Sequence, residues 1–173
     1  MKIKSPLQHA TPNQHEAGFT LIELLIVMSV MLILMTLAIP QLLKVSKTAN
    51  ETSATASVHA IGQAELEYNS SFPQNGFSCT LAALGGLPGT PPSATAAEVL
   101  DPGLAAGTKS GYIINSTNCT KVTVNNHDMI TGYEITAVPV SIGRSGDRGY
   151  CMDENNIMKF DPAGGTNCTQ SLQ

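Results

Sequence analysis

The sequence predicts an α+β protein in which one long N-terminal helix, membrane-spanning in its first half, packs against a small antiparallel β-sheet head. Two patterns lead to this prediction. An apolar run from Leu21 to Ile39 continues into residues with helical spacing as far as Tyr68. Short strand-like segments separated by turn residues follow Ser110. The 173 residues suffice for one modest domain with an appendage.

Residues 1–18 are polar, include Lys2 and Lys4, and show no hydrophobic period. We expect them to form a cytoplasmic leader, because basic residues are enriched on the cytoplasmic side of membrane segments. An ordinary secretory signal has a shorter apolar core that is followed by small residues at its cleavage site. Here the small residue, Gly18, comes before the apolar core.

Residues 19–40 are expected to form a transmembrane helix. The nineteen residues from Leu21 to Ile39 carry a single formal charge, at Glu23. At 1.5 Å per residue they are roughly 28 Å long, which just spans a bilayer. We expect a helix kink at Pro40, which lacks a backbone donor. A plain signal anchor would leave Glu23 unexplained, because a carboxylate in an apolar span costs about 2.5–3.5 kcal/mol.

Residues 41–70 are expected to form an amphipathic continuation of this helix, which needs a partner surface to be stable. Small or apolar residues step by three or four along one weakly apolar face: Leu42, Val45, Ala49, Thr52, Ala56, Ala60, Ala64 and Tyr68. The charged residues of this segment lie off that stripe: Lys44, Lys47, Glu51, Glu65 and Glu67.

Residues 71–109 are expected to form a connecting region, since Gly and Pro pairs interrupt it, with short helical pieces at 79–84 and 94–100. Residues 110–173 are expected to form the β-sheet head, with a hairpin turn at 153–156. Asn, Gly and Asp turns separate the candidate strands, which cover residues 112–114, 121–124, 133–138, 149–152 and 156–160.

All four cysteines follow the apolar segment, and none forms a CxxC motif. An even number of cysteines on the exported side predicts two disulfides, and the alternative is four buried free thiols. Three pairings are possible, and the sequence does not choose among them. The cysteines are Cys79, Cys119, Cys151 and Cys168.

The segment Gly18-Phe19-Thr20-Leu21-Ile22-Glu23-Leu24 resembles the processing motif of type IV pilins and type II secretion pseudopilins. The match includes the glycine before the cut, the phenylalanine that becomes the first mature residue, and a glutamate at the fifth. Pro40 also stands where this family commonly has a proline. After residue 70 the similarity rests on the layout, on Phe72-Pro73, and on the hairpin from Gly149 to Phe160.

The resemblance implies that a membrane aspartic prepilin peptidase cuts between Gly18 and Phe19 and then N-methylates Phe19. Gly18 suits this role because a residue without a side chain can pass through a tight protease site. The implied partners are further copies of the chain in a helical homopolymer, an inner-membrane assembly platform, and minor pilins. The preferred disulfide pairing is Cys79–Cys119 with Cys151–Cys168, which resembles the family's disulfide-bounded C-terminal region.

Glu23 is expected to direct assembly. Its own helix N-terminus offers some hydrogen bonding. A stronger partner would be the Phe19 amine of a neighbouring subunit at a fixed axial stagger. Because that amine exists only after cleavage, assembly would depend on processing.

Bulk charge and isolated polar residues exclude other classes of function. The net charge is −4, and it becomes −5 when the leader with Lys2, Lys4 and Glu16 is removed. This balance argues against a nucleic-acid partner. No catalytic, cofactor or metal site is predicted, and we do not expect an enzyme. His59 and His127 are isolated.

An acidic scatter near the C-terminus is expected to consist of solvated turn residues, and it does not match an EF-hand. A calcium site there would follow only by analogy with major pseudopilins. The residues are Asp147, Asp153, Glu154 and Asp161.

Three functions remain open from the sequence. The preferred one is a subunit of a type IV pilus-like surface filament that serves adhesion, twitching motility or DNA uptake. The alternatives are a pseudopilin of a type II secretion system and, in another class, a membrane-anchored binding domain. The expected location is the inner membrane before assembly and then the cell surface, or the periplasm for a pseudopilin.

Overall fold

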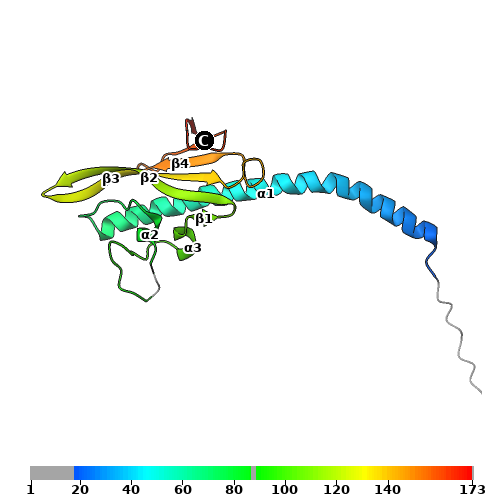
Figure 1. The fold of residues 1–173 in the computed structure, drawn as a ribbon, viewed down its shortest axis with the longest axis horizontal. Coiled ribbons are helices and arrows are strands. Elements are labelled where there is room, and N and C mark those ends of the chain that lie inside the picture. Colours follow the sequence, from blue (N-terminus) through cyan, green and yellow to red (C-terminus); the bar gives the residue numbers. More distant parts are fainter. Residues whose placement is uncertain (1–17, 87–88, 173) are drawn as a thin grey trace, which may run out of the picture. The chain divides into compact units, whose positions relative to one another are not determined.

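The fold combines one long helix with a six-stranded antiparallel sheet, in a computed structural model that describes residues 18–86 and 89–172 (Figure 1). The strands are hydrogen-bonded in sequence order. The predicted α+β class, with its long N-terminal helix, is therefore confirmed. The leader expected at residues 1–18 lies outside the described residues except for Gly18. The elements are α1 (Leu21–Ser71), α2 (Leu81–Leu84), α3 (Pro102–Ala105), β1 (Thr108–Lys109), β2 (Tyr112–Val124), β3 (His127–Pro139), β4 (Gly149–Asp153), β5 (Met158–Asp161) and β6 (Gln170–Ser171).

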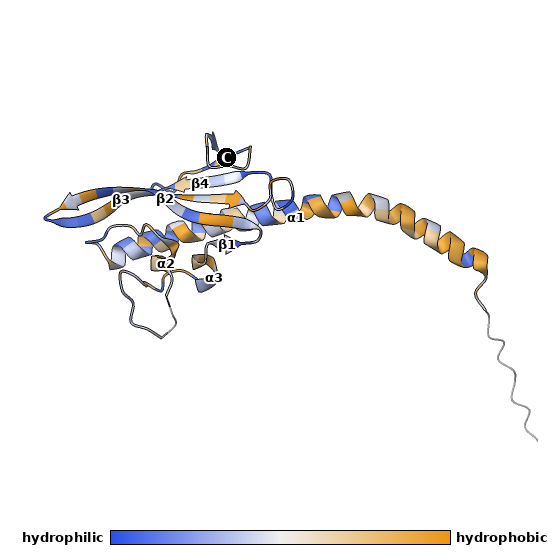
Figure 2. Ribbon diagram, viewed as in Figure 1, coloured by the Kyte–Doolittle hydropathy of each residue, from blue (hydrophilic) through white to orange (hydrophobic). Residues whose placement is uncertain are grey.

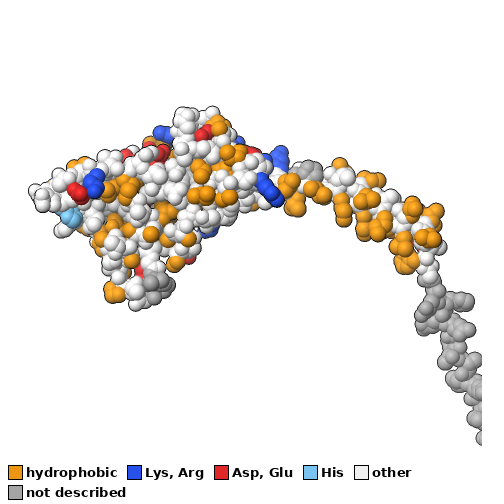
Figure 3. Space-filling model, viewed as in Figure 1, with side chains coloured by type: hydrophobic (Ala, Val, Ile, Leu, Met, Phe, Trp, Pro, Cys, Tyr) orange, Lys and Arg blue, Asp and Glu red, His pale blue; other side chains and the backbone are white. Residues whose placement is uncertain are grey.

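The chain divides at Pro40 into two compact units. In the first unit, the apolar side chains of α1 are exposed on all sides. This part of the helix is mostly orange in Figure 2, with a few paler or blue bands, and mostly hydrophobic over its visible face in Figure 3. It is long and apolar enough to cross a membrane. The kink expected at Pro40 falls on the division between the units and stays a prediction.

In the second unit, one face of α1 packs against the sheet. Val58 and Ile61 are fully buried at its centre. The face expected from the sequence was largely wrong, because Ala56 and Ala60 are exposed. Steps of four residues rotate by about 40° each, so a stripe built on them winds around a helix of 3.6 residues per turn. The buried residues of this face are Ala54, Ser57, Val58, Ile61, Ala64, Glu65 and Tyr68.

The sheet is dominated by a long hairpin of β2 and β3, each of 13 residues. Asn125 and Asn126 form its turn with φ angles of 52° and 64°, as a type I′ turn requires. The strands expected at 112–114 and 121–124 are parts of the single strand β2. Residues 115–120 were missed because they are mostly polar, but side chains that are exposed or half-buried, as these are, can be polar within a strand.

In the connecting region, residues 71–109, the second of the two expected helical pieces is wrong. No helix forms at 94–100. Residues 97–100 instead donate backbone hydrogen bonds to the carbonyls of Ala83, Leu84 and Gly85 at the end of α2, where helix carbonyls need donors. The helix begins later, at α3, since the Asp101 side chain caps it and Pro102 suits its first position. The turn expected at 153–156 is confirmed by a hydrogen bond from Asn156 N–H to Asp153 O.

Truncating the centre of the helix–sheet core should destabilise the head. Ile61 is 0 % exposed, so Ile61→Ala should lower the free energy of unfolding by about 2–5 kcal/mol through lost burial and a residual cavity. Chemical denaturation of the detergent-solubilised chain measures this change. Leu66→Ala is the matched control, because Leu66 lies on the same helix and is 40 % exposed. Equal losses in the two variants would contradict this core.

Candidate functional site

The N-terminal site is a helix cap built by Thr20 and Glu23. Thr20 directly precedes α1, and its N–H and hydroxyl donate to Glu23 Oε2 at 2.9 and 2.8 Å. In return, Glu23 N–H donates to Thr20 Oγ1 at 3.3 Å. This reciprocal pair is a capping box, which satisfies backbone donors that a helix start otherwise leaves open. The carboxylate is therefore held at the first turn of the apolar helix.

The cap leaves one carboxylate oxygen available. Both hydrogen bonds that Glu23 accepts go to Oε2, and Oε1 has no partner in the part of the chain that the structure describes. Phe19, at the expected cut, precedes Thr20 and is 82 % exposed. A cationic amine from another molecule could reach Oε1 without breaking the cap. The sequence analysis missed this cap, although the pattern Thr20-x-x-Glu23 is its signature.

The remaining polar side chains of the apolar segment are satisfied by their own helix. Ser29 Oγ donates to Ile26 O, and Thr36 Oγ1 donates to Ile33 O, each at 2.7 Å. Such bonds remove the donors that hydrocarbon could not satisfy. Glu23 is thus the residue of this segment with a charged group left for an outside partner.

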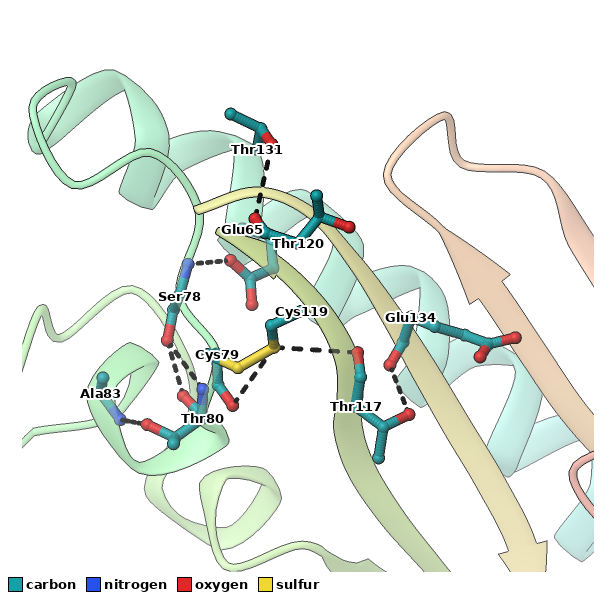
Figure 4. Close-up of a disulfide and its surroundings, with 10 residues drawn as sticks. All are labelled: Glu65, Ser78, Cys79, Thr80, Ala83, Thr117, Cys119, Thr120, Thr131 and Glu134. Atoms are coloured by element: carbon teal, nitrogen blue, oxygen red, sulfur yellow. Dashed lines mark hydrogen bonds between the residues drawn. A yellow bond between two sulfur atoms is a disulfide. The ribbon is translucent and has the colours of Figure 1, made fainter. Parts of the chain in front are cut away.

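A second carboxyl, Glu65, is buried in the head where α1 meets the hairpin. The side chain is 0 % exposed, and its Oε2 accepts a hydrogen bond from Ser78 N–H at 2.7 Å (Figure 4). Phe77 N–H donates to Ile130 O on β3, which holds the segment before Ser78 against the hairpin. The sequence placed Glu65 off the apolar stripe, so its burial was not expected.

Burial changes the ionisation of Glu65. Loss of water raises its pKa to about 8, and the hydrogen bond from Ser78 opposes that rise only in part. Its Oε1 and Tyr133 Oη are both buried without a hydrogen-bond partner among the described residues. The carboxyl therefore keeps its proton through most of the neutral range. An ionised Glu65 would leave an unpaired charge inside the helix–sheet contact.

Two disulfides close the head. Cys79–Cys119 ties the segment beside Ser78 to β2, and Cys151–Cys168 ties β4 to the C-terminal segment, with Cα atoms 6.0 Å apart in each pair. This is the pairing preferred above. Such bridges typically add about 2–4 kcal/mol by restricting the unfolded chain.

The acidic residues near the C-terminus serve local structure. Asp161 accepts hydrogen bonds from the N–H groups of Ala163 and Asn167 at 2.9 and 3.2 Å. Asp153 accepts similarly from Asn155 and Ile157. Within residues 18–86 and 89–172, no three metal-ligating side chains of this kind gather.

Comparison with known proteins identifies the N-terminal segment. Residues 13–39 match the family model of the prokaryotic N-terminal methylation motif. This motif implies processing by a prepilin peptidase and assembly of the processed chain into a filament. No curated protein and no solved structure matches the chain.

The capping box can be tested without touching Glu23. Thr20→Val removes the hydroxyl that accepts the Glu23 N–H, at a cost of about 1 kcal/mol, so exchange of that amide proton should be roughly five-fold faster. Hydrogen exchange in detergent micelles, followed by NMR, measures this rate. Thr20→Ser keeps the hydroxyl and should exchange like the unmodified chain. The cap is disproved by a Val variant that exchanges no faster than the Ser variant.

Burial of Glu65 predicts a pH-dependent stability of the head. Below pH 4.5, the ordinary pKa, the carboxyl is protonated whether the chain is folded or unfolded, and the folded state bears no penalty. Between that pH and about 8 only the folded state keeps the proton. Stability should therefore fall by up to ~1.4 kcal/mol per pH unit in this window and level off above it.

The matched variants are Glu65→Gln and Glu67→Gln. Gln at 65 can still accept from Ser78 but cannot ionise, so denaturation midpoints should depend much less on pH. Glu67 is exposed on the same helix turn, and its variant should keep the full dependence. If the Glu65 variant kept the slope of the unmodified chain, the burial of this carboxyl would be wrong.

Proposed function

We propose that this chain, whose residues 13–39 form the class III signal peptide of type IV pilins and pseudopilins, is the precursor of a structural subunit of a type IV pilus-like surface filament. Pilins and pseudopilins are structural proteins, so the proposed role is structural and not catalytic. The observation that carries the proposal is the capped Glu23 carboxylate at the start of a helix whose apolar side chains are exposed.

Cleavage between Gly18 and Phe19 would change the charge at this site. It removes the polar leader and leaves a cationic amine on Phe19, which N-methylation would preserve. The amine of one subunit would pair with Glu23 Oε1 of its neighbour as a charge-assisted hydrogen bond, which is strong where water is excluded. Thr20 supports this step because its hold on Oε2 orients the carboxylate.

The apolar side chains of α1 would be covered twice. Lipid surrounds them while the subunit is in the inner membrane, and the helices of neighbouring subunits replace lipid in the filament. A helix that is apolar on all sides suits both environments. Extraction from lipid would rely on the assembly platform of the inner membrane, with minor pilins as further partners.

The head favours a pilus over a pseudopilus. Two disulfides fit lasting exposure outside the cell, and the head is rich in Thr, Asn and Gly. The modest size and the break at Phe72-Pro73 resemble major pseudopilins, which keeps the secretion role as the second candidate.

Processing and assembly can be measured separately in cells that express the assembly machinery. Sheared filaments of the unmodified chain should contain subunits that begin at N-methylated Phe19, as read by mass spectrometry. Gly18→Val should remain uncleaved, because the side chain obstructs the protease. Glu23→Ala should be cleaved but form no filaments, because the amine has no partner.

Electron microscopy of surface filaments and a secretion assay complete this test. Normal filaments from Glu23→Ala, or filaments of uncleaved subunits, would sink the proposed mechanism. Deletion that abolishes surface filaments supports the pilus role. The pseudopilin role is supported instead if deletion blocks protein secretion and if no surface filaments are seen at native expression.

A further inference from the structure

Residues 73–79, called the strap below, cross the helix–sheet contact at the place where Glu65 is buried. The strap begins just after the end of α1 and ends at Cys79, which is bonded to Cys119 of β2. Between these two ends the strap, which the structure describes in full, belongs to no helix or strand. It is therefore an irregular segment that is covalently fixed on both sides.

Backbone pairing with β3 holds the middle of the strap. Phe77 N–H donates to Ile130 O, and Ile130 N–H donates to Asn75 O, each at 2.9 Å. Gly76 lies between these bonds with a φ of 74°, and a Cβ there would collide with Ile130 O. The strand β4 pairs with the same edge of β3 only from Glu134 onwards. The strap thus covers a part of the β3 edge that no strand covers.

The strap also covers two buried polar atoms. Glu65 Oε1 and Tyr133 Oη have no hydrogen-bond partner among the described residues. Ser78 is 3 % exposed and closes over the carboxyl by donating its N–H to Oε2 at 2.7 Å (Figure 4). The Phe77 ring lies against the Tyr133 ring, with centroids 5.0 Å apart. While the strap is in place, both polar groups are kept from water.

No cation balances the charge that an ionised Glu65 carries. Among the described residues, no Lys, Arg or His side chain lowers its pKa. The strap has no charged side chain, and β2 has none before Lys121, which pairs with Asp128 at 3.1 Å. The titratable groups beside Glu65 and beside Tyr133 are all acids: Tyr68 on α1, Tyr133 on β3, Asp153 at the end of β4 and Glu154 after it. An ionised Glu65 therefore needs water.

We propose that the strap is a pH-sensitive cover that opens when Glu65 loses its proton, while α1 and the sheet stay folded. Opening admits water to the carboxylate. The strap yields first because few hydrogen bonds hold it, whereas α1 and β3 have continuous ladders. The hydrogen bond from Ser78 opposes opening, but burial outweighs it, since the pKa of Glu65 is raised to about 8 despite that bond.

Opening changes the surface of the head. It frees the Phe77 ring and the backbone N–H and C=O of Ile130 on the edge of β3. A free strand edge is a template for pairing with another strand. Because both ends of the strap stay fixed, it closes again when the proton returns. All of these groups lie within residues 41–173, so opening needs neither a membrane nor a filament.

The opening equilibrium should follow the ionisation of Glu65. The carboxyl ionises at about pH 8 under the closed strap and near its ordinary 4.5 once water reaches it. Below the lower value the proton is bound in both states, and the strap stays closed. Between the two values, opening should increase by up to about ten-fold per pH unit, and it should level off above the higher one.

Hydrogen exchange of the full chain in detergent micelles, followed by NMR, measures this opening at single amides. After correction for the intrinsic rate, exchange at Phe77 and Ser78 should show the ten-fold rise. It should be faster than at Ile61 and Ile135, which are 0 % exposed in α1 and β3. Low concentrations of denaturant should hardly change it, because local opening exposes little surface.

Three variants test the cause. Glu65→Gln cannot ionise, so corrected exchange at Phe77 should not depend on pH. Glu67→Gln is the matched control, because Glu67 is exposed on the same helix turn, and it should keep the full dependence. Gly76→Ala should hold the strap open at every pH, since its Cβ collides with Ile130 O. Its exchange at Phe77 should be fast even where Glu65 is protonated.

The contrary outcomes are distinct. If Phe77 and Ser78 exchange at the same rate as Ile61 and Ile135, with the same denaturant dependence, ionisation unfolds the whole head and no local cover exists. Corrected exchange at the strap that ignores pH, or that keeps its pH dependence in Glu65→Gln, also overturns the device. These outcomes leave filament assembly untouched, because that is measured through Phe19 and Glu23.

Discussion

The constraint on which the rest of this protein depends is that the first half of α1 carries apolar side chains on every side and that these side chains are exposed. Burial of apolar side chains is worth about 25 cal/mol per Å², so such a surface needs either lipid or other helices. In the proposed function, membrane insertion covers this surface with lipid, and polymerisation after removal of the leader covers it with the helices of neighbouring subunits. In that proposal the head can remain polar, because α1 supplies both the anchor and the contact between subunits.

Two carboxyl groups on α1 are used in opposite ways. Glu23 is held by Thr20 at the helix start and keeps one oxygen for an outside cation. Glu65 is shut inside the head against Ser78, and burial raises its pKa to about 8, so it behaves as a neutral polar group. In the proposed function the first residue connects subunits, whereas the second belongs to the contact between helix and sheet.

The sequence predicted the structure correctly where a pattern is compatible with only one kind of element. The long apolar run predicted α1, and the turn residues near 153–156 predicted the hairpin there. The buried face of α1 was harder to predict, because the alanines are spaced by four residues and therefore wind around the helix. Val58 and Ile61 were not recognised as the buried centre for this reason. Burial of Glu65 depends on Ser78 folding back over it, which no local pattern encodes. The Thr20 cap was readable, since its spacing is a known signature.

The central claim is that the amine created at Phe19 pairs with Glu23 of a neighbouring subunit. Filaments assembled from mixed heavy- and light-isotope subunits, treated with a zero-length carbodiimide and analysed by mass spectrometry, test it directly. The Lys47–Asp147 ion pair is the positive control, at 2.8 Å within one chain. We expect a Phe19–Glu23 cross-link that joins heavy to light subunits. Filaments that yield the control cross-link but no such mixed-isotope pair would contradict the account.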